Sequence, residues 1–132
     1  LVGVEFFITT DDIIFSELSP RPHDTGMVTM YTQNLSEFDL HARAILSYPI
    51  NNILMLREGY STVIKANGFE DKNFDYKFSG IAKALELEDV DIRLFGKPKA
   101  WNNRRLGLIL SKNREIGQKA KSLIFINKKN NY

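Results

Sequence analysis

The fold of this chain is decided first at residues 1–18, LVGVEFFITTDDIIFSEL. Apolar side chains occupy every second position from Val2 to Ile8, which is the period-two pattern of a β-strand. Residues 10–12, Thr-Asp-Asp, have turn-forming side chains, and a second apolar run follows at 13–18. Residues 1–18 are therefore predicted to form a β-hairpin.

The length of the hairpin loop decides which side chains face one another. With a three-residue loop at 10–12, Phe7 lies opposite Phe15 and Glu5 lies opposite Glu17. Two like charges directly opposite cost roughly 0.2 to 1 kcal/mol, and a divalent cation would compensate for this repulsion. A loop of another length would send the two glutamates to opposite faces of the hairpin. The spacing alone leaves both interpretations open.

Residues 16–26, SELSPRPHDTG, combine two carboxylates, a guanidinium, an imidazole and three hydroxyls with two prolines. Prolines at alternate positions hold the backbone extended, which presents side chains rather than burying them. This segment is therefore the candidate active site. At its end, Asp24 and Thr25 are residue types that cap helices, so they favour a helix over a strand for residues 27–33.

The rest of the chain predicts an α+β fold with two domains. Ser36 and Asp39 form a capping-box pattern that begins a helix at about 37–47. Residues 1–50 are predicted to form one domain, 51–58 a connector and 59–132 a small β-rich domain. In this second domain, strands are expected at 60–66, 90–95, 106–110 and 123–126, and helices at 78–87 and 113–122.

Composition limits the kinds of site that the chain can contain. It has no cysteine and two histidines, which excludes disulfides, thiolate metal sites and histidine-rich zinc sites, so oxygen atoms must hold any metal. The net charge of +2 gives no argument for binding to nucleic acid or to a membrane. No apolar run reaches the roughly 20 residues that span a bilayer, and a cytoplasmic protein is expected.

A second chemically dense stretch is the turn at 96–105, GKPKAWNNRR, which carries Lys97, Lys99, Arg104 and Arg105 between two predicted strands. These cations form either a solvated tip or a phosphate-binding site, because paired arginines offer forked donors and a lysine offers a point charge. The residues themselves do not decide between the two interpretations.

Several motifs are similar to the C-terminal part of one enzyme family, formate-dependent phosphoribosylglycinamide formyltransferase, which is an ATP-grasp family of purine biosynthesis. The similarity is carried by GVEFF at 3–7, FSELSPRPHDTGMVT at 15–29, QNLSEF at 33–38, RLFGKP at 93–98 and RRLG at 104–107. A related carboxylase family, which acts on aminoimidazole ribonucleotide, has His-Asn-Ser-Gly where this chain has HDTG at 23–26.

The resemblance implies a fold and a reaction. The fold is the C-terminal portion of an ATP-grasp domain, a β-hairpin plus helices, followed by a small domain that resembles a reduced hybrid motif. The reaction activates formate with ATP to formyl phosphate, which the amine of glycinamide ribonucleotide then attacks.

The resemblance also implies roles for named residues. Glu5 and Glu17 correspond to the glutamates that bind Mg²⁺ and, through it, ATP. The residues that correspond to the ribonucleotide-binding set are Asp24, Lys97, Arg104 and Arg105. Arg21 and His23 are candidates for the formyl phosphate pocket. As alternatives, Arg21 pairs with a carboxylate and His23 fixes the loop by hydrogen bonding.

The chain lacks the glycine-rich loop and the upstream lysines of an ATP-grasp enzyme, and it begins at Leu1 within a strand pattern. We therefore expect a fragment that is inactive alone and that works with the missing N-terminal portion of the same enzyme, a homodimer when complete. The alternatives are an ATP-grasp purine enzyme of the aminoimidazole ribonucleotide carboxylase type, or a truncated binding or assembly module without catalysis.

Overall fold

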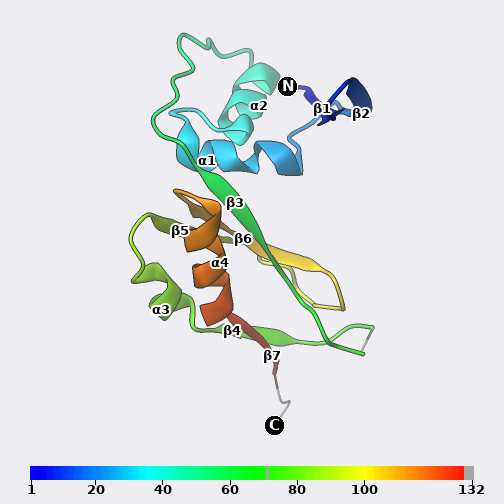
Figure 1. The fold of residues 1–132 in the computed structure, drawn as a ribbon, viewed down its shortest axis with the longest axis vertical. Coiled ribbons are helices and arrows are strands. Elements are labelled where there is room, and N and C mark those ends of the chain that lie inside the picture. Colours follow the sequence, from blue (N-terminus) through cyan, green and yellow to red (C-terminus); the bar gives the residue numbers. More distant parts are fainter. Residues whose placement is uncertain (71, 130–132) are drawn as a thin grey trace. The chain divides into compact units, whose positions relative to one another are not determined.

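The computed structural model describes residues 1–70 and 72–129. They divide into two compact units, Leu1–Arg57 and Glu58–Tyr132 (Figure 1). The first unit holds a β-hairpin and short helices, and the second holds antiparallel sheets with two helices. None of the helices in the described part of the chain is long and apolar enough to cross a membrane.

The predicted hairpin is formed by strands β1 (Gly3–Ile8) and β2 (Ile13–Ser19), but its loop is longer than expected. Ile8 pairs with Ile13, so the loop has four residues, 9–12. Hydrogen bonds between Thr9 and Asp12 close this loop, because the backbone N–H of Thr9 donates to the Asp12 carbonyl at 2.9 Å. The expected pairing of Phe7 with Phe15 is wrong, since Phe6 faces Phe15 instead.

A β-bulge nevertheless places Glu5 opposite Glu17, as predicted. The register shifts between Glu5 and Phe6, which leaves Ser16 as the extra residue on β2. Without this bulge, the four-residue loop would pair Glu5 with Ser16 and send Glu17 to the other face of the hairpin. The bulge therefore puts the two carboxylates side by side.

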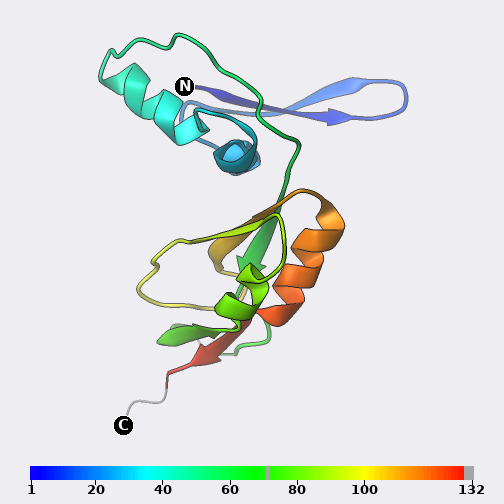
Figure 2. The ribbon, with the colours of Figure 1, turned by 90° about the vertical axis from the view of Figure 1, so that its left-hand side faces the viewer.

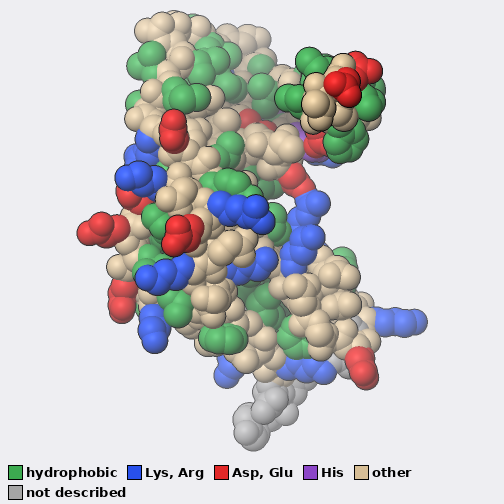
Figure 3. Space-filling view, in the orientation of Figure 1, with side chains coloured by type: hydrophobic (Ala, Val, Ile, Leu, Met, Phe, Trp, Pro, Cys, Tyr) green, Lys and Arg blue, Asp and Glu red, His purple; other side chains and the backbone are tan. Residues whose placement is uncertain are grey.

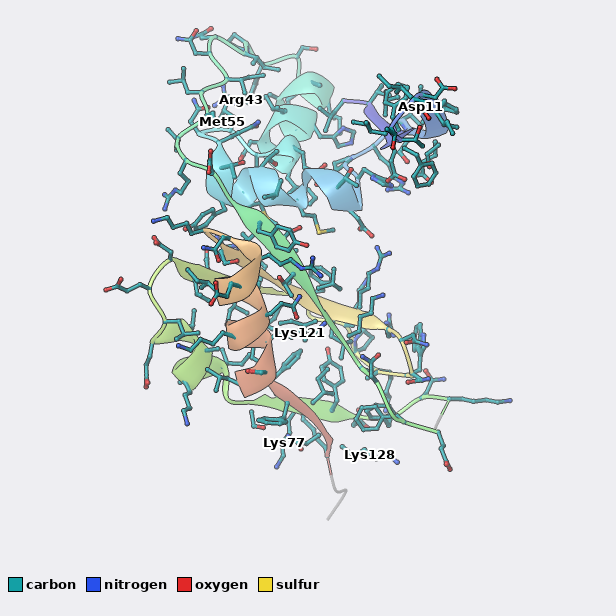
Figure 4. All side chains as sticks on the ribbon, viewed as in Figure 1. Asp11, Arg43, Met55, Lys77, Lys121 and Lys128 are labelled. Carbon is teal, nitrogen blue, oxygen red and sulfur yellow. The ribbon has the colours of Figure 1, made fainter. Side chains whose placement is uncertain are left out.

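One face of the hairpin is entirely apolar. It consists of three cross-strand pairs, Val4–Leu18, Phe6–Phe15 and Ile8–Ile13. All six side chains are exposed, and the Phe6 and Phe15 rings meet edge to face with centroids 6.1 Å apart. Apolar side chains are visible on the hairpin in Figure 3, and Asp11 lies at its tip in Figure 4.

Three short helical segments follow the hairpin in the first unit. The segment η1 (Asp24–Val28) is a 3₁₀ turn that leads into α1 (Thr29–Thr32). The predicted helix is confirmed, but its N-cap is His23 rather than Asp24 or Thr25. The capping box between Ser36 and Asp39 is confirmed at the start of α2 (Glu37–Ile45).

Residues 46–59 then run without regular secondary structure apart from one β-bridge, Gln33–Met55 (Figure 4). The Asn34 side chain holds this segment, because its Oδ1 accepts the Leu54 N–H at 2.8 Å and its Nδ2 donates to the Asn52 carbonyl at 3.2 Å.

The second unit is built on a three-stranded antiparallel sheet in the order β3–β6–β5. Its strands are β3 (Tyr60–Lys65), β5 (Val90–Leu94) and the buried central strand β6 (Arg105–Ser111). Helix α4 (Arg114–Leu123) packs on this sheet and also contacts α3 (Ile81–Leu85), as the two ribbon views show (Figures 1 and 2). Apolar residues of β6 form much of the core, with Leu106, Ile109 and Leu110 fully buried.

A second, two-stranded sheet pairs β4 (Tyr76–Ser79) with β7 (Phe125–Lys128). The sequence predicts a helix from residue 78, and this is wrong because Phe78 lies in β4. Gly80 separates strand from helix, since it has a left-handed φ of 81° and a Cβ atom at this position would lie 1.8 Å from the Leu123 carbonyl oxygen.

Candidate functional site

The centre of the candidate site in the first unit is the carboxylate pair Glu5 and Glu17. Side chains directly opposite in an antiparallel pair have Cβ atoms about 4.5–5.5 Å apart. Each carboxylate is oriented by a serine: Ser16 Oγ donates to Glu5 Oε1 at 2.9 Å, and Ser19 Oγ donates to Glu17 Oε1 at 3.0 Å. In each glutamate the other oxygen, Oε2, has no hydrogen bond or ion pair within the described residues. The bulge residue Ser16 thus both sets the register and holds Glu5.

His23 connects this carboxylate pair to the following loop. Its Nε2 lies 2.6 Å from Glu17 Oε1, and its Nδ1 lies 3.0 Å from Thr25 Oγ1. The imidazole is largely buried, with 16% of its side-chain surface exposed, whereas the Glu17 side chain is 51% exposed. His23 is therefore held between the hairpin and the start of η1.

The two other candidates in this loop are exposed. Arg21 donates from Nη1 to the carbonyl of Pro22 at 2.9 Å, and among the described residues its guanidinium forms no ion pair with a carboxylate. Asp24 is the first residue of η1 and follows His23 directly, so the backbone of His23 also places the backbone of Asp24.

A buried glutamate that the sequence analysis did not identify lies beneath the same loop. Glu37, the first residue of α2, is 6% exposed, and its Oε2 accepts the backbone N–H of His23 at 2.8 Å. Its Oε1 is buried and has no hydrogen-bond partner within residues 1–70 and 72–129. The sequence around Glu37 indicates only a helix start, so no local signal identifies this contact fourteen residues back along the chain.

The donor set fits a divalent cation that also binds another ligand. Mg²⁺ prefers oxygen ligands and is usually held by one or two carboxylates together with water and substrate phosphates. Glu5 and Glu17 supply two such carboxylates on one face of the hairpin. Within the described part of the chain, no group of three or more His, Cys, Asp or Glu side chains could enclose a metal ion. The pair therefore suits a shared Mg²⁺–phosphate site rather than a closed metal cage.

In the second unit, the predicted cations lie on the connection between β5 and β6 and at the start of β6. Arg104 is half-buried, with its guanidinium 3.6 Å from the centroid of the Trp101 ring and Nη1 donating to the Lys99 carbonyl at 2.8 Å. Stacking on an aromatic ring fixes the plane of a guanidinium, which prepares it for a forked contact with an anion.

The three other cations of this turn, Lys97, Lys99 and Arg105, are exposed. Arg105 begins β6, and the hydroxyl of Tyr76 donates to the Lys97 carbonyl at 2.7 Å, which fixes the backbone of the turn. The Lys99 ammonium lies 2.7 Å from the Asp75 carboxylate, with which it forms an ion pair. Lysine and arginine side chains on the second unit are coloured blue in Figure 3.

Two known families match the two units in turn. Residues 1–38 match the ATP-grasp domain, and residues 59–123 match the family described as PurT, C-terminal. A formate-dependent phosphoribosylglycinamide formyltransferase from Trichormus variabilis is 59% identical over 112 residues, which cover 85% of this chain. A protein of the same name from Syntrophotalea carbinolica is 54% identical over 110 residues. The chain spans 28% and 27% of the length of these two relatives.

Solved structures give the same result for the fold. A glycinamide transformylase T from Mycobacterium tuberculosis has a TM-score of 0.69 and 27% identity, over 94% of this chain and 35% of that one. A carboxyaminoimidazole ribonucleotide synthetase from Thermotoga maritima has a TM-score of 0.85 over 97% of this chain and 37% of that one; at 24% identity it shows the fold alone. The predicted resemblance and the α+β fold class, the C-terminal portion of an ATP-grasp fold, are both confirmed.

Proposed function

We propose that this chain is a portion of a formate-dependent phosphoribosylglycinamide formyltransferase. The proposal follows from its similarity, along most of its length, to the C-terminal part of such enzymes. The complete enzyme would use ATP and formate to formylate glycinamide ribonucleotide, in the cytoplasm and as a homodimer. The observation that carries the proposal is the Glu5–Glu17 pair, which the bulge at Ser16 brings to one face within the matched ATP-grasp segment. This portion would be inactive without the rest of the enzyme.

Glu5 and Glu17 are proposed to hold the Mg²⁺ that ATP brings with it. When bound, the ion would neutralise charge on the phosphates during phosphoryl transfer. The protein's own contribution is geometric: the hydroxyls of Ser16 and Ser19 each fix one oxygen of a carboxylate and leave the other available.

The residues proposed to contact the ribonucleotide are Asp24, Lys97, Arg104 and Arg105. Asp24 would accept hydrogen bonds from its amino or hydroxyl groups, and Lys97, Arg104 and Arg105 would bind its phosphate. The Trp101 ring supports the proposed role of Arg104, since it leaves the guanidinium oriented without neutralising its charge.

His23 and Arg21 are proposed to line the pocket in which formyl phosphate forms. In that reaction a formate oxygen bonds to the γ-phosphorus as ADP leaves. The substrate amine then bonds to the formyl carbon as phosphate leaves. The 2.6 Å contact between His23 Nε2 and Glu17 Oε1 supports this role, because it holds the imidazole beside the proposed Mg²⁺ ligand.

An assay of ADP release tests the proposal. It uses the full-length protein that contains this chain, with formate and glycinamide ribonucleotide omitted in turn. ADP release that needs both compounds is expected. Release that needs bicarbonate instead of formate would support a carboxylase of the aminoimidazole ribonucleotide type. No ATP-dependent turnover with any of these compounds would support a binding module without catalysis.

A further inference from the structure

The loop that carries His23 and Asp24 rests on the side chain of Glu37. Glu37 Oε2 accepts the His23 backbone N–H at 2.8 Å. From the other side, the backbone N–H of Glu37 donates to Thr29 Oγ1 at 2.8 Å, and this hydroxyl donates to the Gly26 carbonyl at 2.5 Å. One residue of α2 is thus connected by hydrogen bonds to both ends of the segment 23–26.

Gly26 allows this contact because it has no side chain. A Cβ atom at this position would lie 2.2 Å from Glu37 Oε2 and 2.7 Å from its Cδ, which is closer than atoms approach. The φ of Gly26 is not in the left-handed region, so proximity to Glu37 rather than backbone conformation requires the glycine. The carboxylate therefore packs directly against the loop backbone.

Packing alone does not explain a carboxylate at this position. Glu37 is 6% exposed and its Oε1 is buried without a hydrogen-bond partner in the described residues, an arrangement that costs free energy. An apolar side chain of similar size would fill the same space without that cost. What the carboxylate adds is an acceptor for the His23 N–H at the start of α2.

We infer that Glu37 is a positioning residue for glycinamide ribonucleotide binding. By holding the His23 backbone, it fixes the imidazole against Glu17 and places the backbone of the adjoining Asp24. Glu37 itself need not touch the substrate. This inference rests on the function proposed above, and it adds a residue that acts through the loop rather than in the reaction.

Two variants of the full-length enzyme distinguish the effect of the hydrogen-bond acceptor at position 37 from the effect of side-chain volume. Glu37→Gln keeps the volume and one acceptor oxygen, whereas Glu37→Leu keeps the volume without an acceptor. Loss of a hydrogen bond to a charged group should raise the KM for glycinamide ribonucleotide at least about tenfold in Glu37→Leu. The KM for ATP should change by less than about threefold, and Glu37→Gln should stay within about threefold of wild type for both substrates.

The matched control is Asp39→Ala, which removes the capping box of the same helix without touching the loop. It should reduce stability but leave both KM values unchanged. Equal KM values in Glu37→Leu and Glu37→Gln, or a parallel rise for both substrates, would overturn the inference.

Two further measurements keep the inference testable if the proposed function fails. Hydrogen exchange at the His23 amide should be at least about tenfold faster in Glu37→Leu than in Glu37→Gln, whether or not the enzyme formylates anything. Gly26→Ala should perturb this amide more in the wild-type background than in Glu37→Ala, because the added methyl meets the carboxylate only in the former. Equal exchange rates, or an equal effect of Gly26→Ala in both backgrounds, would show that Glu37 does not hold the loop.

Discussion

Replacing Glu5 by glutamine should stabilise the protein in the absence of Mg²⁺ and remove the stabilisation that Mg²⁺ and ADP provide. The reason is that Glu5 and Glu17 face each other across the hairpin. Two carboxylates in this arrangement repel each other until a cation lies between them. The same substitution therefore has opposite effects with and without the metal.

The size of the effect follows from the cross-strand geometry. At about 5 Å in water-like surroundings, two unit charges interact with about 0.8 kcal/mol, and physiological salt lowers this value. The Glu17 side chain is 51% exposed, so the water-like dielectric applies. Glutamine also keeps an Oε1 that can accept the Ser16 hydroxyl. A gain of about 0.5 kcal/mol is expected without metal.

Urea unfolding of the full-length protein, with and without Mg²⁺ and ADP, measures both effects. Wild type should gain about 2.7 kcal/mol when the ligand is present at 100 times its Kd, and Glu5→Gln should gain far less. Glu88→Gln, an exposed glutamate of the other unit, should behave as wild type. A Glu5→Gln protein that is less stable than wild type without metal, or that responds fully to Mg²⁺ and ADP, would refute the carboxylate-pair reasoning.

Three further predictions concern the basic turn at 96–105, the glycine at position 80 and the cap of α2. Arg104→Ala and Arg105→Ala should each raise the KM for glycinamide ribonucleotide by about tenfold or more, with a much smaller change for ATP; equal changes would argue against phosphate binding by this turn. Gly80→Ala should cost at least about 2 kcal/mol in urea unfolding, because an added Cβ would lie 1.8 Å from a carbonyl oxygen. The control Gly68→Ala has a similar φ of 78° but open space around it, so it should cost only about 1 kcal/mol, and equal losses would contradict the clash. Hydrogen bonds from the Ser36 side chain and backbone lower the pKa of Asp39 below its ordinary value of 3.8. The stabilisation that Asp39 provides should therefore be complete above pH 3.8 and be lost as the pH falls through the lower pKa of the folded state. A stability advantage of wild type over Asp39→Asn that persists unchanged at the lowest pH would contradict this.

The hairpin shows which structural features the sequence predicts and which it does not. Alternating apolar residues predict both strands correctly, because the pattern depends only on neighbours along the chain. The facing of Glu5 and Glu17 is also correct, but the loop length assumed for it is wrong. The four-residue loop shifts the register by one, and the bulge at Ser16 shifts it back. Two compensating irregularities cannot be seen in spacing alone, since each depends on backbone hydrogen bonds between the strands.

Helix boundaries also differ in how well the sequence predicts them. The capping box at Ser36 can be predicted from the sequence because all of its atoms come from four consecutive residues. The cap of η1 cannot be predicted in this way, because His23 is the N-cap residue and one of its contacts is with Glu37, fourteen residues away. The apolar spacing from Phe78 onward predicts a helix, yet pairing with Ile126 makes Phe78 part of a strand.

By itself, the sequence determined most of the strands and helices and identified the candidate carboxylates and cations, because local patterns and family motifs consist of residues that are close together in the chain. The tertiary structure alone decided which oxygen of each glutamate is held by a serine, that His23 lies against Glu17, and that Glu37 supports the loop from below. These contacts join residues that are distant in the chain. They depend on burial and on hydrogen-bond geometry, which exist only after the chain has folded.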